Sequence, residues 1–104
     1  MWKVSNNDIQ MVEGDFGIEL PISVSGTTLT ASDELRITFK LGEETILEKE
    51  YSNIENNTIA LSLTEQESAL FPVGLYVYSL DWYQDGVFMC NVVPHAVFKV
   101  VDKA

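Results

Sequence analysis

The sequence predicts an all-β protein, an antiparallel sandwich of seven to eight short strands that forms one domain over residues 1–104, with one short helical turn near residues 64–70. Three observations lead to this prediction. Apolar residues recur at every second position in several runs, as strands with one buried face require. Turn-forming residues separate the runs roughly every ten residues. Only one segment carries the start signal of a helix.

The composition agrees with a folded domain. Hydrophobic residues make up 46% and charged residues 21% of the 104 positions, which is close to the average for globular proteins. A chain of this size can bury a stable core without disulfides or metals. The sequence starts without a signal peptide and has no apolar run long enough to cross a membrane. We therefore expect a soluble protein with no membrane partner.

The first strands are expected in the N-terminal third. A short one should run from Asp8 to Val12. Pro21 lies on the polar face of the next run and lacks an N–H, so that strand should be an edge or carry a bulge. Residues 25–28 should then turn. The apolar positions of this second strand are Phe16, Ile18, Leu20, Ile22 and Val24.

The middle of the chain predicts three more strands and the helical turn. Inward residues are expected at Leu35, Ile37, Phe39 and Leu41, then along residues 46–51, then at Ile59, Leu61 and Leu63. Thr64 and Glu67 can form a capping box, in which each side chain bonds the backbone N–H of the other. Pro72 and Gly74 limit the helix to one or two turns. Leu70 and Phe71 are predicted to plug this end of the sandwich.

The C-terminal third predicts a hairpin whose first strand turns four large residues inward, namely Tyr76, Tyr78, Leu80 and Trp82. A two-residue loop at Asp85-Gly86 would place Asn91 opposite Leu80. A three-residue loop instead pairs Trp82 with Phe88, Leu80 with Cys90 and Tyr78 with Val92. We prefer the three-residue loop because it keeps the inner face apolar. After an interruption at Pro94, the last strand should turn three residues inward, namely Ala96, Phe98 and Val100.

The residue sets of an enzyme or a metal site are missing from the sequence. Cys90 is the only cysteine and His95 the only histidine; Cys90 is expected to be buried, so a Cys–His pair is not predicted. No zinc-binding spacing is present. The carboxylates best spaced for calcium lack the ligand density of a dedicated loop; they are Asp8, Glu13 and Asp15. We predict no enzyme activity, no metal and no cofactor.

The charge is strongly acidic and uneven. The formal net charge is −10, which opposes binding to nucleic acid or to an anionic membrane. Counting Asp, Glu, Lys and Arg, residues 1–32 carry −3, residues 33–67 carry −6 and residues 68–104 carry −1. The nearly neutral third is therefore the part of the chain best suited to contact another protein.

The outer face of the C-terminal hairpin predicts such a contact. In the preferred register its apolar members are Val77, Tyr83, Val87, Met89 and Val93. A strand that is apolar on both faces must be covered on both. The cover is either another protein chain, as in a homo-oligomer or a contact with a neighbouring protein, or the terminal segment around Trp2 and Val4. We favour the intermolecular contact.

The order of several motifs resembles one known family. They are Gly14-Asp15-Phe16, residues 33–40 (DELRITFK), residues 61–67 (LSLTEQE), residues 72–80 (PVGLYVYSL) and Asp85-Gly86. This order is similar to the immunoglobulin-like N-terminal domain of siphophage baseplate and tail proteins from Gram-positive hosts, with the upper baseplate protein family the nearest example. The sequence departs from the family at residues 91–96, where the family has a threonine- and glycine-bearing segment.

The resemblance implies an immunoglobulin-like sandwich that acts as a non-catalytic structural or assembly module of a phage or prophage particle, in the tail, the baseplate or the head–tail region. It implies contacts with copies of itself or with neighbouring virion proteins, and a place in the virion or in the host cytoplasm before assembly. The alternative is a carbohydrate-binding or host-recognition module that would use clustered aromatic residues, namely Tyr76, Tyr78, Trp82 and Tyr83.

Overall fold

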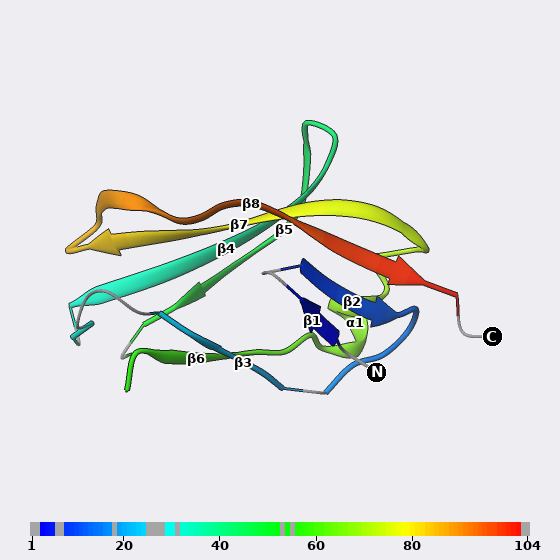
Figure 1. Cartoon of the computed structure of the whole chain (residues 1–104), viewed down its shortest axis with the longest axis horizontal. Coiled ribbons are helices and arrows are strands. Elements are labelled where there is room, and N and C mark those ends of the chain that lie inside the picture. Colours follow the sequence, from blue (N-terminus) through cyan, green and yellow to red (C-terminus); the bar gives the residue numbers. More distant parts are fainter. Residues whose placement is uncertain are drawn as a thin grey trace.

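A computed structural model describes residues 3–5, 8–17, 19–24, 29–30, 32–52, 54 and 56–102. They form strands β1 (Lys3–Ser5), β2 (Asp8–Val12), β3 (Leu20–Ser23), β4 (Asp33–Leu41), β5 (Glu44–Tyr51), β6 (Thr58–Leu61), β7 (Gly74–Gln84) and β8 (Val87–Val101), with helix α1 (Glu65–Ser68) between β6 and β7. Figure 1 shows β3 and β6 facing a larger sheet across the molecule.

The strands form two sheets. The larger has the order β1-β2-β8-β7-β4-β5 and the smaller pairs β3 with β6. The pairs are antiparallel except β2 and β8, which run parallel. The last four strands of the larger sheet have the order of one sheet of an immunoglobulin domain. The β3–β6 pair matches the centre of the other sheet, so the arrangement is immunoglobulin-like. The all-β sandwich prediction is confirmed, with one parallel pair that the sequence did not indicate.

The core lies between the two sheets and follows the predicted alternation. Leu35, Ile37 and Phe39 of β4 are completely buried, because successive side chains of a strand point to opposite faces. Leu41 was expected to continue this series but is exposed. The pairing of β4 with β5 shifts register between Phe39 and Lys40, so the alternation does not carry through to the end of the strand.

The short helix begins at the predicted capping box. Thr64 Oγ1 accepts the Glu67 N–H at 3.1 Å, and Glu67 Oε1 accepts the Thr64 N–H at 2.9 Å. Phe71 is buried after the helix, as predicted, whereas Leu70 is exposed and that part of the prediction is wrong. The chain turns as it leaves α1, so two neighbouring apolar residues face opposite ways.

A tyrosine fixes the corner where the chain enters β7. Tyr76 is almost fully buried, and its hydroxyl donates to the Pro72 carbonyl oxygen at 2.7 Å. A tyrosine near the start of this strand that bonds to backbone just upstream is the tyrosine corner of immunoglobulin-like domains. The contact holds the crossing segment against the end of the sandwich.

Replacing Tyr76 by phenylalanine should lower the free energy of unfolding by about 1–2 kcal/mol, because the Pro72 carbonyl would lose its donor in a partly buried site. Urea unfolding measures this loss as a lower midpoint with an unchanged slope. A variant as stable as the wild type would show that the hydroxyl contributes nothing to the corner.

The strand predicted from Phe16 is shorter than expected. β3 covers only Leu20–Ser23, Phe16 is exposed, and the predicted strand start is wrong. Gly14 and Gly17 both have positive φ, which interrupts an extended chain. Pro21 lies on an edge as predicted, since β3 pairs only with β6 among the described strands. Ile18 and the expected turn at 25–28 lie outside the described residues.

The register of the C-terminal hairpin corrects the prediction. Asp85 and Gly86 have φ of 50° and 79°, as in a type I′ turn, and Gln84 pairs with Val87 across this two-residue loop. The three-residue register is therefore wrong. The observed pairs are Trp82 with Cys90, Leu80 with Val93 and Tyr78 with Ala96.

Irregularities in β8 make this register compatible with an apolar core. The β7–β8 pairing shifts three times, so β8 contains more residues than β7 opposite it. One shift lies between Tyr78, which pairs with Ala96, and Leu80, which pairs with Val93. Pro94 falls within this shift, where its missing N–H removes no regular ladder hydrogen bond. β8 thus continues through Pro94, which was predicted to interrupt it. Phe98 and Val100 are buried as predicted, and Ala96 packs against the core.

Candidate protein interaction surface

A buried carboxylate anchors the free end of the β7–β8 hairpin. Asp33, at the start of β4, is 2% exposed. Its Oδ1 accepts the Trp82 indole N–H at 2.9 Å, and its Oδ2 accepts the Thr30 backbone N–H at 2.6 Å and the Thr30 hydroxyl at 3.2 Å. The hydrogen bond from the Thr30 N–H, followed by the bond from Trp82, lowers the pKa of Asp33. Burial acts in the opposite direction but does not outweigh these bonds. The carboxylate therefore ties β7 to the loop before β4.

The outer face at this end carries an ordered aromatic pair. The rings of Tyr83 and Phe88 pack edge to face, with centroids 5.6 Å apart and planes at 71°. The Arg36 guanidinium lies 3.9 Å from the Tyr83 ring centroid. Arg36 is held in turn by Glu34, at 2.8 Å, and by Glu50, at 3.5 Å. A cation over an aromatic face is attracted by the ring quadrupole, so Arg36 stabilises this position of the Tyr83 ring.

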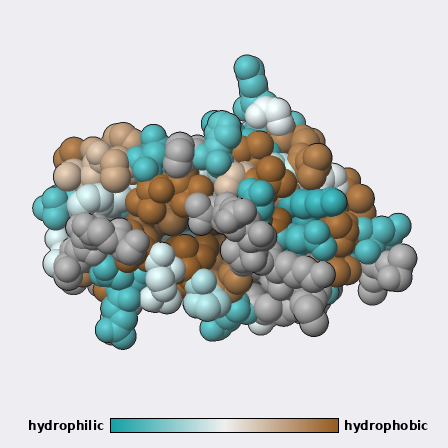
Figure 2. All heavy atoms as spheres, in the orientation of Figure 1, coloured by the Kyte–Doolittle hydropathy of each residue, from teal (hydrophilic) through white to brown (hydrophobic). Residues whose placement is uncertain are grey.

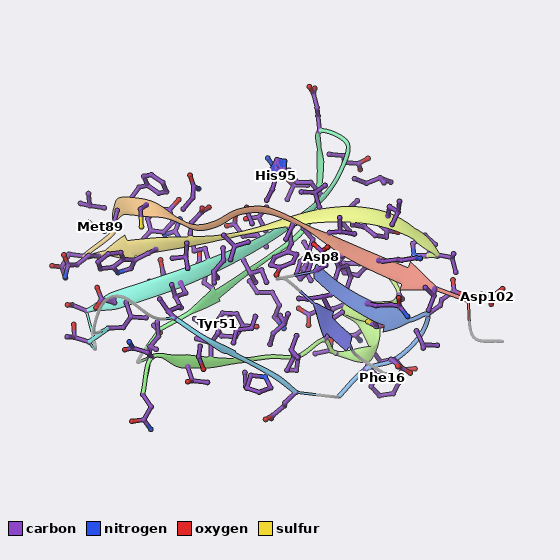
Figure 3. All side chains as sticks on the ribbon, viewed as in Figure 1. Asp8, Phe16, Tyr51, Met89, His95 and Asp102 are labelled. Atoms are coloured by element: carbon purple, nitrogen blue, oxygen red, sulfur yellow. The ribbon has the colours of Figure 1, made fainter. Side chains whose placement is uncertain are left out.

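Large apolar side chains are exposed next to this pair. Val87 is 62% exposed, Phe88 50% and Met89 44%. We call these three residues together with Tyr83 the hairpin cluster. Figure 3 shows Met89 at the hairpin end, and apolar atoms gather at that end in Figure 2. Three consecutive exposed hydrophobic residues are unusual on a surface that has no partner.

The five residues predicted to form an outer apolar face separate into three places. Tyr83, Val87 and Met89 lie at the hairpin end and belong to the hairpin cluster, but Val87 pairs with Gln84 and therefore faces the opposite side of the sheet from Tyr83, against the prediction. Val77 also lies on the outer face, but it pairs with Val97, six residues along β7 from Tyr83 and so about 20 Å away. Val93 packs against the core opposite Leu80, and its predicted outward direction is wrong because the register shift beside it reverses the facing.

Two residues expected in the core lie on the surface. Phe88 and Cys90 are exposed, so the prediction that Cys90 is a buried hydrophobe is wrong. Phe88 is the member of the hairpin cluster that the sequence reasoning missed. The Asp85-Gly86 pair, a strong signal for a two-residue turn, would have placed Phe88 opposite Tyr83. The alternative cover around Trp2 and Val4 falls outside the described side chains.

The same segment forms a sheet edge. β8 pairs with β2 only from Phe98 to Val101, and the Val97 N–H is taken by the Asp8 carboxylate at 2.9 Å. Within the described strands, residues 87–96 have a backbone neighbour only on the β7 side. Bulges and Pro94 blunt this edge against long strand pairing. Residues 86–98 contain no Asp, Glu, Lys or Arg. Contacts at this edge therefore depend on apolar and other polar side chains rather than on those four charged types.

Two polar side chains away from the hairpin end, Tyr51 and Glu67, have shifted pKa values that their surroundings in the fold explain. Burial raises the pKa of Tyr51 to about 12, and Figure 3 shows this residue between the sheets. Burial opposes ionisation of Glu67, but the Thr64 N–H and the Lys49 ammonium outweigh it and lower the pKa of Glu67. Over the described ranges, no three His, Cys, Asp or Glu residues group as metal ligands, and the calcium alternative at residues 8, 13 and 15 forms no such group.

No helix in the described part of the chain is long and apolar enough to cross a membrane. No model of a known protein family matches the sequence, and a search of curated proteins finds no significant match. The geometry at the hairpin end is therefore the main guide to function.

Proposed function

We propose that this chain is a non-catalytic protein interaction module, a structural or assembly component of a phage or prophage particle that acts in the tail, baseplate or head–tail region. The observation that carries the proposal is the hairpin cluster. Three successive large apolar residues are exposed directly after a type I′ turn, in the third of an acidic chain whose net charge is nearly zero.

The chemistry of the hairpin cluster favours a protein partner. Aromatic residues and methionine are enriched at the centres of protein interfaces, where charged residues are depleted. Part of the cluster is held in place before binding, because Arg36 lies over the Tyr83 ring, Phe88 packs against that ring, and the type I′ turn sets the backbone between the two strands. Preorganisation of this kind lowers the entropy cost of association.

The phage context rests on the order of motifs that resembles siphophage baseplate and tail domains, and on the immunoglobulin-like arrangement of the strands. In this proposal the partner is a second copy or a neighbouring virion protein. Nucleic acid is a poor partner for a chain with a net charge of −10, because phosphates repel it.

The carbohydrate-binding alternative receives less support. Sugar recognition by stacking needs exposed aromatic faces, whereas Tyr76 and Tyr78 are buried in the core. Trp82 donates to the buried Asp33, and one face of Tyr83 is covered by Arg36. The four aromatic residues that suggested this alternative do not form an exposed platform.

Substituting Met89 by glutamate should weaken association at least tenfold, because a charge would have to be desolvated inside an apolar contact. Light scattering across a wide concentration range measures self-association. Co-purification with the structural proteins encoded beside the gene measures contacts with other components. The matched control is Leu75→Glu, an exposed residue on the outer face at the far end of β7, which should change association less than twofold.

The proposal is wrong if the wild type is monomeric at all concentrations and Met89→Glu binds those encoded proteins as well as the wild type does. Equal losses in Met89→Glu and Leu75→Glu would also contradict it, since they would reflect added charge rather than the hairpin cluster.

A further inference from the structure

A groove of about 370 Å³ opens between the two sheets, separate from the hairpin cluster. Its floor consists of core side chains, among them Ile9, Tyr78 and Leu80. One wall is the run Leu20–Val24, and the other contains Val92 and Val93 of β8. Figure 2 shows apolar atoms exposed in the middle of the molecule, between the layers that Figure 1 draws as β8 and β3. Over the described residues, the sandwich is therefore open along this side.

The β3 wall is the edge of the strand rather than one of its faces. Five consecutive residues, 20–24, line the groove, although successive side chains of a strand point to opposite faces. Pro21 and Ser23 are exposed while Leu20 and Ile22 pack against the core. Side chains of both faces can border the same groove only along the edge of the strand. Backbone N–H and C=O groups of β3 therefore border the groove as well.

Some of these backbone groups lack a strand partner on the groove side. The Val24 N–H donates to the Asn57 carbonyl oxygen at 2.8 Å, which marks a hydrogen-bonded pair of the β3–β6 ladder. Because such pairs alternate along antiparallel strands, Ser23 should direct its N–H and C=O, and Pro21 its C=O, away from β6. In the described residues no strand pairs with β3 on that side, where immunoglobulin-like sandwiches place their first strand.

We propose that this groove receives an extended segment of a partner protein, which adds as a strand beside β3. A binding segment must supply backbone N–H and C=O groups to the edge and apolar side chains to the floor. An extended peptide with apolar residues at alternate positions supplies both, whereas a lipid or an apolar small molecule supplies only the second. The edge of residues 20–24 matches a segment of about five residues.

Charge sets the remaining chemistry of this partner segment. The groove itself is lined by uncharged side chains, but exposed carboxylates precede both the β2 and the β3 lining residues, at Asp8 and Glu19. The whole chain carries −10. A segment without acidic residues and with basic flanks fits this field best. The site is independent of the hairpin cluster, so the two proposals can fail separately.

The test is a fusion of the intact chain, through a flexible glycine-serine linker after residue 104, to the donor segment Lys-Val-Thr-Val-Thr-Val-Lys. Tethering gives an effective concentration in the millimolar range, so a weak site is still filled. We expect amide exchange at the Ser23 N–H to slow at least tenfold, because that group gains an acceptor, and the unfolding temperature to rise. NMR-detected exchange measures the first effect and calorimetry the second.

Matched controls separate groove binding from unspecific effects of the fusion. A donor with threonine in place of each valine should give no protection at Ser23, since it keeps the backbone and loses the apolar side chains. Val92→Lys in the groove wall should abolish the protection by the valine donor. Val97→Lys, on the outer face of the same strand, and Met89→Glu, in the hairpin cluster, should leave the protection unchanged.

Three outcomes would overturn the proposal. One is unchanged Ser23 exchange with the valine donor, and another is equal protection by the threonine donor. The third is a Ser23 N–H that is already protected in the unfused chain, either at all concentrations or increasingly as concentration rises. Protection at all concentrations would mean that the β3 edge is covered within the molecule. Protection that rises with concentration would mean that another copy of the chain covers it.

Discussion

Replacing Asp33 by asparagine is expected to lower the free energy of unfolding by about 2–4 kcal/mol, because the carboxylate accepts three hydrogen bonds in a buried site. The three donors are the Trp82 indole and the backbone and hydroxyl groups of Thr30. Asparagine has nearly the same shape, but its NH2 group would face a donor. Chemical denaturation at pH 7 measures the loss.

The pH dependence gives a second signature of the same residue. The folded pKa of Asp33 lies below its ordinary value of 3.8. A group of this kind contributes stability above the pKa of the unfolded chain and loses it as the pH falls through the folded pKa. The stability difference between wild type and Asp33→Asn should therefore be constant from about pH 5 to 7 and shrink below about pH 4.

Asp85→Asn is the matched control, because it removes a carboxylate from the same end of the hairpin at a position where asparagine suits the turn. Its effect should stay within about 0.5 kcal/mol. A difference between wild type and Asp33→Asn that persists unchanged at pH 3 would show that ionisation of Asp33 is not what stabilises this end of the fold.

The elements that the sequence predicted well are those with a simple period. In β4, the apolar residues Leu35, Ile37 and Phe39 alternate with polar residues. The apolar set is buried because alternate side chains of a half-buried strand all face the core. The helix start was also predictable, since Thr64 and Glu67 satisfy each other's backbone without help from the rest of the fold.

β8 could not be predicted because its period is interrupted. Each register shift adds a residue on one strand, and every shift exchanges which side chains face the core. Val93 changed faces for this reason, whereas Phe88 lies opposite Tyr83 because the loop has two residues rather than three. At Asp85-Gly86 the local turn preference was a stronger constraint than an unbroken apolar inner face, because the positive φ of both residues forms a two-residue loop.

The sequence directed attention to the nearly neutral C-terminal third, which contains the hairpin cluster, and the binding of a partner there stays a prediction. The common outward face predicted for five residues was wrong for Val87 and Val93, because each pairs with a residue of the opposite face of β7. The groove beside β3 gave no signal in the sequence, because it depends on which strand lacks a neighbour. That property belongs to the pairing of distant segments, which a single sequence does not reveal.

Replacing Phe71 by alanine should cost about 3–5 kcal/mol, the range for removing a buried aromatic ring that leaves a cavity. Phe71 is almost completely buried, and its ring packs edge to face against Phe39, Tyr76 and Phe98 at centroid distances of 5.3, 5.1 and 5.2 Å. These contacts join the segment after α1 to three strands of the larger sheet. Urea unfolding measures the loss as a lower midpoint.

Leu70→Ala provides the control at the adjacent position. Leu70 is 47% exposed, so its truncation should change the free energy of unfolding by no more than about 0.5 kcal/mol. The sequence treats these two neighbours alike, as a pair of apolar residues between a helix and a proline. Similar losses for both variants would mean that Leu70 also packs in the core in solution and that the chain does not turn after α1 as described. A large loss for Phe71 alone would show that one ring closes this end of the sandwich.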